Sequence, residues 1–244
     1  MKKFFLIVFI TLCAIFIYLK VESLGSPSSS FNQTTRYQLG HYQLWRSILG
    51  LHSYGDARAW YLEGNQQIRL DVVEANGADF SSQALSGFVD EIKKYTGRGV
   101  QVYDYEKINN GVLSDQDIQT IVANDHNTNF FGQPELFVLY VQDYNHPDGE
   151  VAKTYQEYGI IVSHDQLMQV TKYFPDSLPE YEQSTLLHEF GHQLGLEHDT
   201  GNNCVMNAAV DHPILTNSFS GNYTPTDFCQ SEVDSINAIK AALQ

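Results

Sequence analysis

Three of the chain's nine histidines lie close together, at positions 188, 192 and 198. His188 and His192 are four residues apart, and on an α-helix this spacing places two side chains on one face, one turn above the other. Two imidazoles in this arrangement can bind the same metal ion. Histidine nitrogen is a preferred ligand of Zn²⁺ and of other transition metals. The spacing therefore predicts a metal site carried by a helix.

The residues around this pair could complete a catalytic site. Glu189 is turned about 100° from His188 around the helix axis, which is too far for a natural third ligand but close enough to reach a water on the metal. Gly195 permits the left-handed conformation that ends a helix, so His198 can return to the same ion from a turn. Three neutral nitrogens with one open position are typical of a catalytic zinc site. Glu189 then has the position of a general base.

The stretch "HEFGHQLGLEHD" resembles the HExxHxxGxxH signature of the metzincin zinc peptidases. Met206, in "CVMN", is similar to the methionine of the metzincin Met-turn, which forms an apolar floor beneath the metal. The resemblance implies one catalytic Zn²⁺ ion, whose ligands would be His188, His192 and His198. It implies Glu189 as the base, and structural roles for Met206, Gly195 and Asp199.

Details of the motif resemble two different metzincin branches. Asp199 directly after the third histidine, the Cys204-Val-Met206 run and the "FC" at 228 to 229 are similar to the adamalysin or reprolysin branch. The spacing from His198 to Cys204 and Met206 is similar instead to the archaemetzincins, which bind a second, structural zinc with four cysteines. Asp199 stands where their first cysteine would be, and too few cysteines remain for such a site. The interpretation is a disulfide between Cys204 and Cys229.

The resemblance implies a zinc-dependent endopeptidase in which a zinc-activated water attacks a peptide bond and Glu189 carries the proton. An extended substrate would pair with a rim strand within residues 150–162, and the segment 207–217 would set specificity. Two alternatives remain open. One is an extracellular binding module that contains zinc without turnover, and the other is a zinc amidase that acts on cell-wall peptides.

The helix that carries the motif has a predictable start and a predictable core face. Ser177 followed by Glu180 is a capping box, and Pro179 fits the first turn, where its missing N–H is not needed. The helix therefore begins near residue 177 and ends before Gly195. The apolar residues on it that can face the core are Leu187, Phe190 and Leu194.

Upstream, apolar patterns alternate between the periods of strands and of helices. Strands are predicted at 68–73, 100–105, 136–141 and 158–163, the third as a central buried strand. Further helices are predicted at 36–51, 81–95, 114–122 and 231–243. The prediction is one α/β (α+β) domain of metzincin type. It has a mixed twisted sheet packed by helices, the active-site helix, and a loop-rich C-terminal part that ends in a helix.

An uncharged apolar run at residues 4–19 follows two lysines, which is typical of an export signal or a membrane anchor. Residues 24–35 are rich in Ser and have linker composition. The predicted organisation is a signal peptide or anchor at 1–23, a linker at 24–35 and a metzincin-like catalytic domain at 36–244. The N-terminal part of this domain runs to about 195 and its C-terminal part begins at about 196. The domain is expected outside the cytoplasm, on the outer face of a membrane or secreted.

Charge and cysteine content limit the partners and the compartment. The formal net charge is −15 at pH 7, so the surface repels nucleic acid and anionic lipid headgroups. Beyond the leader, which holds Cys13, two cysteines remain. In an oxidising compartment two cysteines form a disulfide, and the alternative is two buried free thiols. The expected partner is a peptide or protein substrate and not nucleic acid. The membrane is contacted through the N-terminal segment if that is uncleaved, and the protein is expected to be a monomer.

Overall fold

The computed structural model describes residues 2–23, 31, 35, 39, 57–104, 107–109, 112–125, 133–145, 149–155, 158–199, 204–207 and 224–243. The predicted linker at 24–35 and the predicted helix at 36–51 lie outside the described residues, apart from three single positions. The predicted specificity segment at 207–217 also lies outside them, except for its first residue. The division of the chain into three parts therefore stays a prediction.

A five-stranded sheet forms the centre of the domain, in the strand order β2-β1-β4-β7-β6. In chain order its strands are β1 (Ile68–Glu74), β2 (Val100–Asp104), β4 (Glu135–Val141), β6 (Ala152–Tyr155) and β7 (Gly159–Ser163). β6 pairs antiparallel with β7 at one edge, and the other pairs of this sheet are parallel. A separate parallel pair is formed by β3 (Val112–Leu113) and β5 (Asp143–Tyr144). The predicted mixed sheet is confirmed.

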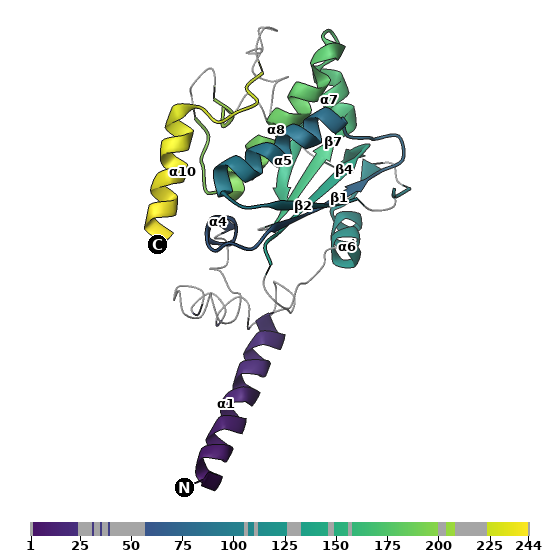
Figure 1. The fold of residues 1–244 in the computed structure, drawn as a ribbon. Coiled ribbons are helices and arrows are strands. Elements are labelled where there is room, and N and C mark those ends of the chain that lie inside the picture. Colours follow the sequence, from purple (N-terminus) through teal and green to yellow (C-terminus); the bar gives the residue numbers. More distant parts are fainter. Residues whose placement is uncertain are drawn as a thin grey trace.

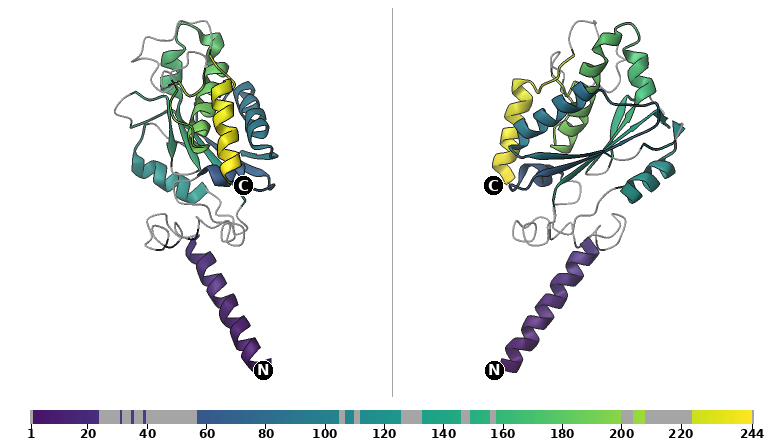
Figure 2. Two further views of the ribbon diagram at one scale, coloured as in Figure 1. Left: turned by 90° about the vertical axis from the view of Figure 1, so that its left-hand side faces the viewer. Right: turned by 45° about the vertical axis from the view of Figure 1, so that its right-hand side comes forward.

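β4 lies in the middle of the sheet, and its whole length is buried. Because side chains alternate along a strand, Leu136, Val138 and Tyr140 belong to one core cluster and Phe137, Leu139 and Val141 to the other. The first cluster includes residues of α5 (Ser82–Thr96) and α8 (Leu178–Gln193), and the second includes residues of α6 (Asp115–Asp125). Figures 1 and 2 show α5 and α8 on one face of the sheet and α6 on the other. Burial on both faces explains why residues 136–141 form a continuous apolar run.

The helix ends follow local capping chemistry. At the start of α5, the Ser81 side chain accepts a hydrogen bond from the Ala84 N–H, and the helix ends at Gly97 with a left-handed φ of 73°. The other helices among the described residues are α1 (Lys2–Ser23), α4 (Ala57–Leu62), α7 (His164–Val170), the 3₁₀ helix η2 (Pro175–Ser177) and α10 (Gln230–Leu243). The helices predicted at 81–95, 114–122 and 231–243 are confirmed, with small shifts at their ends.

The region between β7 and α8 differs from the prediction in two ways. The short helix α7 was not predicted, and it starts from Ser163, whose side chain accepts from the Gln166 N–H. The capping box predicted at Ser177 and Glu180 is wrong, because Ser177 already lies in a 3₁₀ turn with helical backbone angles and makes no cap hydrogen bond. Its hydroxyl instead donates to the Phe174 carbonyl at 2.7 Å. The start of the long helix near residue 177 is correct.

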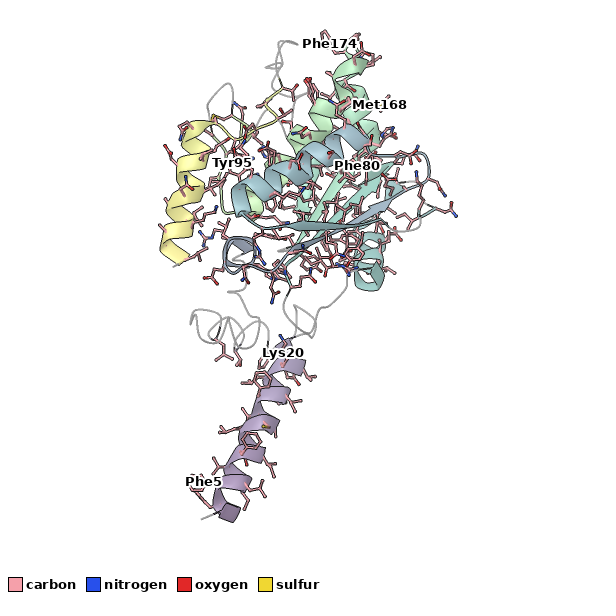
Figure 3. The ribbon with its side chains drawn as sticks, viewed as in Figure 1. Phe5, Lys20, Phe80, Tyr95, Met168 and Phe174 are labelled. Atoms are coloured by element: carbon pink, nitrogen blue, oxygen red, sulfur yellow. A yellow bond between two sulfur atoms is a disulfide. The ribbon has the colours of Figure 1, made fainter. Side chains whose placement is uncertain are left out.

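α1 is long and apolar, and most of its large side chains, Phe5 among them, are exposed (Figure 3). It has 22 residues and spans about 33 Å at about 1.5 Å per residue. The hydrocarbon core of a bilayer is about 30 Å thick. Within the described part of the chain, α1 is the one helix long and apolar enough to cross a membrane. A secretory signal passes the same test.

Candidate metal centre

The structure brings the three clustered histidines together at the C-terminal end of α8: His188, His192 and His198. The backbone reverses at Gly195, which takes a φ of 88° just after the helix. The Leu196 N–H then donates to the Gly191 carbonyl at 2.9 Å, so the chain folds back against the last helical turn. His198 thereby returns to the face of α8 that carries the other two imidazoles.

The three Nε2 atoms converge on one point. They are 3.1 Å apart between His188 and His192, 3.3 Å between His188 and His198, and 3.2 Å between His192 and His198. The Nδ1 atom of His188 lies 2.6 Å from the Val205 carbonyl, and that of His192 lies 3.0 Å from the Leu196 carbonyl. A carbonyl can only accept a hydrogen bond, so each Nδ1 carries the proton. In the neutral ring, Nε2 then presents a lone pair.

This geometry suits a tetrahedral zinc ion. Two imidazole nitrogens that each bind zinc at about 2.0–2.1 Å lie about 3.3 Å apart when the angle between them is tetrahedral. The three separations above are close to that value. Converging lone pairs repel one another unless a cation lies between them. Three histidines leave the fourth coordination position open, as in catalytic sites, so the donor set fits Zn²⁺.

The centre is closed on the side of the core and open on the opposite side. His188 is fully buried, His192 is half-buried and His198 is exposed. Glu189 follows the first of these histidines on α8 and is 3% exposed. The predicted general base is therefore a buried side chain.

Met206 packs against α8 at Gly191. It is fully buried, and a Cβ atom on Gly191 would overlap its sulfur, so glycine permits this close approach. The Met206 carbonyl accepts a hydrogen bond from the Asp199 N–H at 2.7 Å. The segment 204–207 is thereby joined to the loop that carries His198.

Cys204 and Cys229 form the predicted disulfide, with their Cα atoms 5.0 Å apart. This bond joins the segment 204–207 to the start of α10. Asp199 and Glu232 lie beside it, and the four side chains form a second group that could hold a metal ion. The two sulfur atoms are bonded to each other, so neither is a thiolate, which is the form of cysteine that binds metals.

Glu232 is a functional candidate that the sequence analysis missed. It is 4% exposed and accepts hydrogen bonds from the Met206 N–H at 2.6 Å and from the Cys229 N–H at 2.8 Å. Burial raises the pKa of its carboxyl group, and the backbone donors act in the opposite direction without cancelling the rise. A signal was present, because a glutamate at the third position of a helix commonly bonds the N–H of the N-cap residue, here Cys229.

Gln193, next to His192, was also missed. Its amide nitrogen donates to the Gly159 carbonyl at 2.7 Å, and its amide oxygen accepts from the Tyr61 hydroxyl at 3.0 Å. These bonds join the end of α8 to β7 and to α4. No spacing in the sequence indicates contacts between segments so far apart in the chain.

Glu182 fixes the other end of α8. Its buried carboxylate accepts from the Tyr140 hydroxyl at 2.6 Å and from the Ser81 N–H at 3.0 Å. Burial raises the pKa of this carboxyl group, and the two hydrogen bonds oppose the rise. α8 is thus held to β4 and α5 at one end and to β7 at the other, which gives the helical histidines a rigid support.

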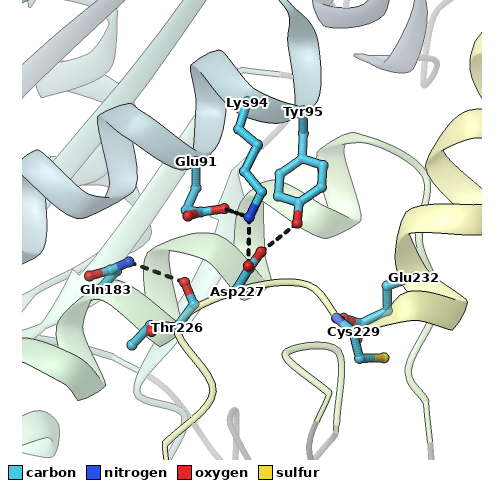
Figure 4. A network of polar contacts seen from close by, with 8 residues as sticks. All are labelled: Glu91, Lys94, Tyr95, Gln183, Thr226, Asp227, Cys229 and Glu232. Atoms are coloured by element: carbon cyan, nitrogen blue, oxygen red, sulfur yellow. Dashed lines mark hydrogen bonds and ion pairs between the residues drawn. The ribbon is translucent and has the colours of Figure 1, made fainter.

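The segment before α10 is held on α5 and α8 (Figure 4). Asp227 accepts from the Lys94 ammonium group at 2.5 Å and from the Tyr95 hydroxyl. The Gln183 amide donates to the Thr226 carbonyl at 3.1 Å. Burial raises the pKa of Asp227, but the hydrogen bonds from Lys94 and Tyr95 outweigh it and hold the pKa below its ordinary value. The disulfide is thereby fixed relative to α8.

No protein-family model and no curated protein matches this chain. Among solved structures, the archaemetzincin of Methanopyrus kandleri superposes with a TM-score of 0.53 at 15% sequence identity, over 72% of this chain and 97% of that chain. This chain has an archaemetzincin-like fold. The α/β architecture predicted from the sequence is therefore confirmed, whereas the similarity to the adamalysin branch stays a prediction.

Two further solved structures are similar to the archaemetzincin-like fold of this chain. One is the archaemetzincin of Archaeoglobus fulgidus complexed with malonate, with a TM-score of 0.40 at 17% identity, over 70% of this chain and 99% of that chain. The other is a zinc-dependent peptidase from Methanocorpusculum labreanum, with a TM-score of 0.47 at 15% identity, over 70% of this chain and 100% of that chain.

Proposed function

We propose that this protein is a zinc-dependent endopeptidase of the metzincin type. The observation that carries the proposal is the convergence of three imidazole Nε2 atoms, 3.1–3.3 Å apart. The two histidines on α8, His188 and His192, donate their Nδ1 protons to backbone carbonyls. The buried Glu189 beside them and the archaemetzincin-like fold support it. The residues that would hold one Zn²⁺ ion are His188, His192 and His198.

Bound there, Zn²⁺ would supply two effects, a lower pKa for a water and the polarisation of a peptide carbonyl. Glu189 accepts a proton from the attacking water and delivers it to the leaving amine. His188 and His192 keep Nε2 aimed at the ion because their Nδ1 protons are held by carbonyls. Hydrolysis of this kind needs no nucleophilic side chain.

An extended peptide is the substrate class that the sheet favours. β6 stands at the end of the described sheet and pairs antiparallel with β7 on one side. An edge strand offers backbone N–H and C=O groups to which a peptide can add as a further strand. β6 covers residues 152–155, inside the rim region predicted at 150–162. Recognition by this edge requires a peptide backbone, which favours a peptidase.

α1 and the disulfide support a location outside the cytoplasm. The helix is long enough to anchor the chain in a bilayer, and disulfides persist in oxidising compartments. The catalytic domain would face the outside of a membrane, tethered by α1 where that segment is uncleaved. Where it is cleaved, the domain would be secreted.

Digestion of a broad peptide library by the full-length protein in detergent micelles tests the proposed function. The wild type should cleave internal peptide bonds, and a chelator should stop the cleavage until zinc is restored. Glu189→Ala should lower kcat/KM by about 10²- to 10⁴-fold because the general base is lost. Its zinc content should be unchanged, since Glu189 is not a proposed ligand.

Three outcomes of this digestion contradict the proposal. Unchanged cleavage by Glu189→Ala removes the general base from the mechanism. If the wild type binds zinc and cleaves no peptide, the protein is an extracellular binding module that contains zinc without turnover. If the protein cleaves peptidoglycan fragments but not unfolded protein, it is a zinc amidase that acts on cell-wall peptides.

A further inference from the structure

Glu232 is connected to the metal centre through a single peptide group. The peptide between Val205 and Met206 has its carbonyl on the first residue and its N–H on the second. The N–H donates to Glu232 Oε1 at 2.6 Å, and the carbonyl accepts from His188 Nδ1 at 2.6 Å. Carboxylate, peptide and imidazole therefore form one continuous chain of hydrogen bonds.

Every member of this chain is buried. Glu232 is 4% exposed, and His188, Val205 and Met206 are fully buried. Hydrogen bonds are stronger in such surroundings than in water, and bonds in series polarise one another. A carboxylate on the N–H shifts electron density toward the carbonyl oxygen of the same peptide. That oxygen then holds the imidazole N–H more firmly.

Both oxygens of Glu232 face backbone donors. Oε2 accepts from the Cys229 N–H at 2.8 Å, while Oε1 accepts from the Met206 N–H. An ionised carboxylate accepts at both oxygens, whereas a protonated acid would turn a hydrogen toward one of these donors. The Cys229 bond fixes the carboxylate beside the disulfide, which reaches back to Cys204. The side chain is thereby held against the Val205–Met206 peptide from two directions.

We propose that Glu232 is a positioning residue for the zinc ligand His188 and acts through the Val205–Met206 peptide. The inference rests on the proposed function, because His188 needs this orientation when its Nε2 binds the ion. Metal-bound histidines commonly donate their second ring proton to a carboxylate or a carbonyl, and loss of such a partner weakens metal binding by about 10- to 100-fold. Here the carbonyl is the direct partner, and the carboxylate stands one peptide further out.

Zinc affinity of the full-length, disulfide-bonded protein in detergent tests this role. Glu232→Gln keeps the shape of the side chain but offers one acceptor oxygen to two N–H donors. We expect it to weaken zinc binding by about 10- to 100-fold, measured by competition with a chelator of known affinity. Asp234→Asn is the matched control, because Asp234 is an exposed carboxylate on the same helix that bonds Gln230. The control should bind zinc as tightly as the wild type.

Unfolding temperatures of the zinc-free samples distinguish two roles of Glu232, the positioning of His188 and the capping of α10 alone. A Glu232→Gln variant that unfolds earlier without zinc, yet binds zinc with wild-type affinity, shows capping alone and overturns the inference. A wild type that binds no zinc overturns the proposed function and this inference with it. If the wild type binds zinc and Glu232→Gln binds it with the same affinity, only the positioning role of Glu232 is overturned.

If Glu232→Gln does not fold, the inference is tested on the wild type, by NMR of its amide protons with and without zinc. Zinc loading should shift the Met206 amide proton, because this N–H shares a peptide with the carbonyl that faces His188. The Cys229 amide proton bonds the other oxygen of Glu232 and should shift much less. Equal shifts at the two amides, or no shift at Met206, would overturn the inference.

Discussion

At the scale of single residues, His198 differs from the other two histidines because it stands outside α8 on an exposed turn. Its Nε2 atom lies 3.3 Å from that of His188 and 3.2 Å from that of His192. A substitution here removes a proposed ligand without opening the core. A substitution at His198 therefore tests metal binding without disturbing the folded core.

His198→Ala should weaken zinc binding by more than about 100-fold, because two imidazoles cannot complete a catalytic zinc site. The zinc-free protein should keep its free energy of unfolding to within about 0.5 kcal/mol, as exposed substitutions usually do. Calorimetric titration with zinc and thermal unfolding measure the two quantities. His164→Ala is the control, since that ring contacts Tyr140 and is not part of the centre. A zinc affinity of His198→Ala equal to that of the wild type contradicts the ligand set.

Spacing in the sequence predicted which histidines meet, because a helix fixes the relation between residues four apart and Gly195 returns the chain. It did not predict the bonds from Glu232 to Met206 and from Gln193 to Gly159, since each joins segments far apart in the chain. The capping box at Ser177 failed because the preceding 3₁₀ turn sets backbone angles that the local motif does not reveal. The roles of the ligands and of Glu189 stay predictions.

At the scale of elements, α8 and the segment 204–207 meet at Gly191, where a Cβ atom would overlap the sulfur of Met206. Gly191→Ala should therefore cost about 1–3 kcal/mol of unfolding free energy, as overpacked cores do. Gly191→Ala should also weaken zinc binding, because displacing Met206 also displaces the adjacent Val205 carbonyl, which accepts the hydrogen bond of His188. Urea unfolding of zinc-free protein and zinc titration measure the two effects.

Gly87→Ala provides the matched control for this contact. Gly87 lies on α5, and a Cβ atom there would meet the flexible side-chain amide of Gln183. That side chain can move aside at the cost of its bond to the Thr226 carbonyl, while Asp227 keeps its bonds to Lys94 and Tyr95. This variant should therefore retain the zinc affinity of the wild type. Wild-type zinc affinity in Gly191→Ala as well would show that the contact with Met206 does not support the centre.

The contacts of Asp227 predict a pH dependence of stability. Burial raises its pKa, but the hydrogen bonds from Lys94 and Tyr95 prevail and hold the folded-state pKa below the ordinary value of 3.8. The folded state then binds fewer protons than the unfolded state, so this contribution is complete above about pH 4 and is lost as the pH falls further. Asp227→Asn should lower the free energy of unfolding at pH 7 by at most about 1 kcal/mol, because the pair is half-exposed.

Urea unfolding of the zinc-free wild type and Asp227→Asn at pH 7 and at pH 3 checks this prediction. The difference between the two proteins should be largest at neutral pH. It should shrink at pH 3, because below the ordinary pKa of 3.8 the unfolded state takes up a proton at this carboxyl group and part of the contribution is lost. A difference that is the same at both pH values contradicts an electrostatic role for the contact.

Periodicity predicted the long elements because burial imposes it. α5 shows an apolar stripe between Ser81 and Gly97, and β4 is apolar throughout because both of its faces are buried. α7 was missed since it is short and exposes Met168, so it has little apolar pattern. The strand order and the antiparallel pairing of β6 depend on contacts between remote segments, which no local pattern specifies.

At the scale of the whole molecule, two sequences that are only 15% identical have a similar fold, over 97% of the archaemetzincin of Methanopyrus kandleri. Such similarity is physically reasonable, because cores of different sequence can form one fold when their volume and apolar pattern are kept. In this chain the sheet supports α8 from below, and the disulfide joins α10 to the segment 204–207. The geometry of the three histidines thus depends on parts spread along the chain.

Zinc K-edge X-ray absorption of the full-length, zinc-loaded protein tests whether the three histidines bind the ion, because it reports the ligand atoms and their distances. We expect one zinc ion surrounded by imidazole nitrogens and a further light atom at about 2.0–2.1 Å, without sulfur. Sulfur ligands at about 2.3 Å would contradict this expectation, since they would place the ion in the group of Asp199, Cys204, Cys229 and Glu232. A folded protein that binds no zinc would contradict it equally.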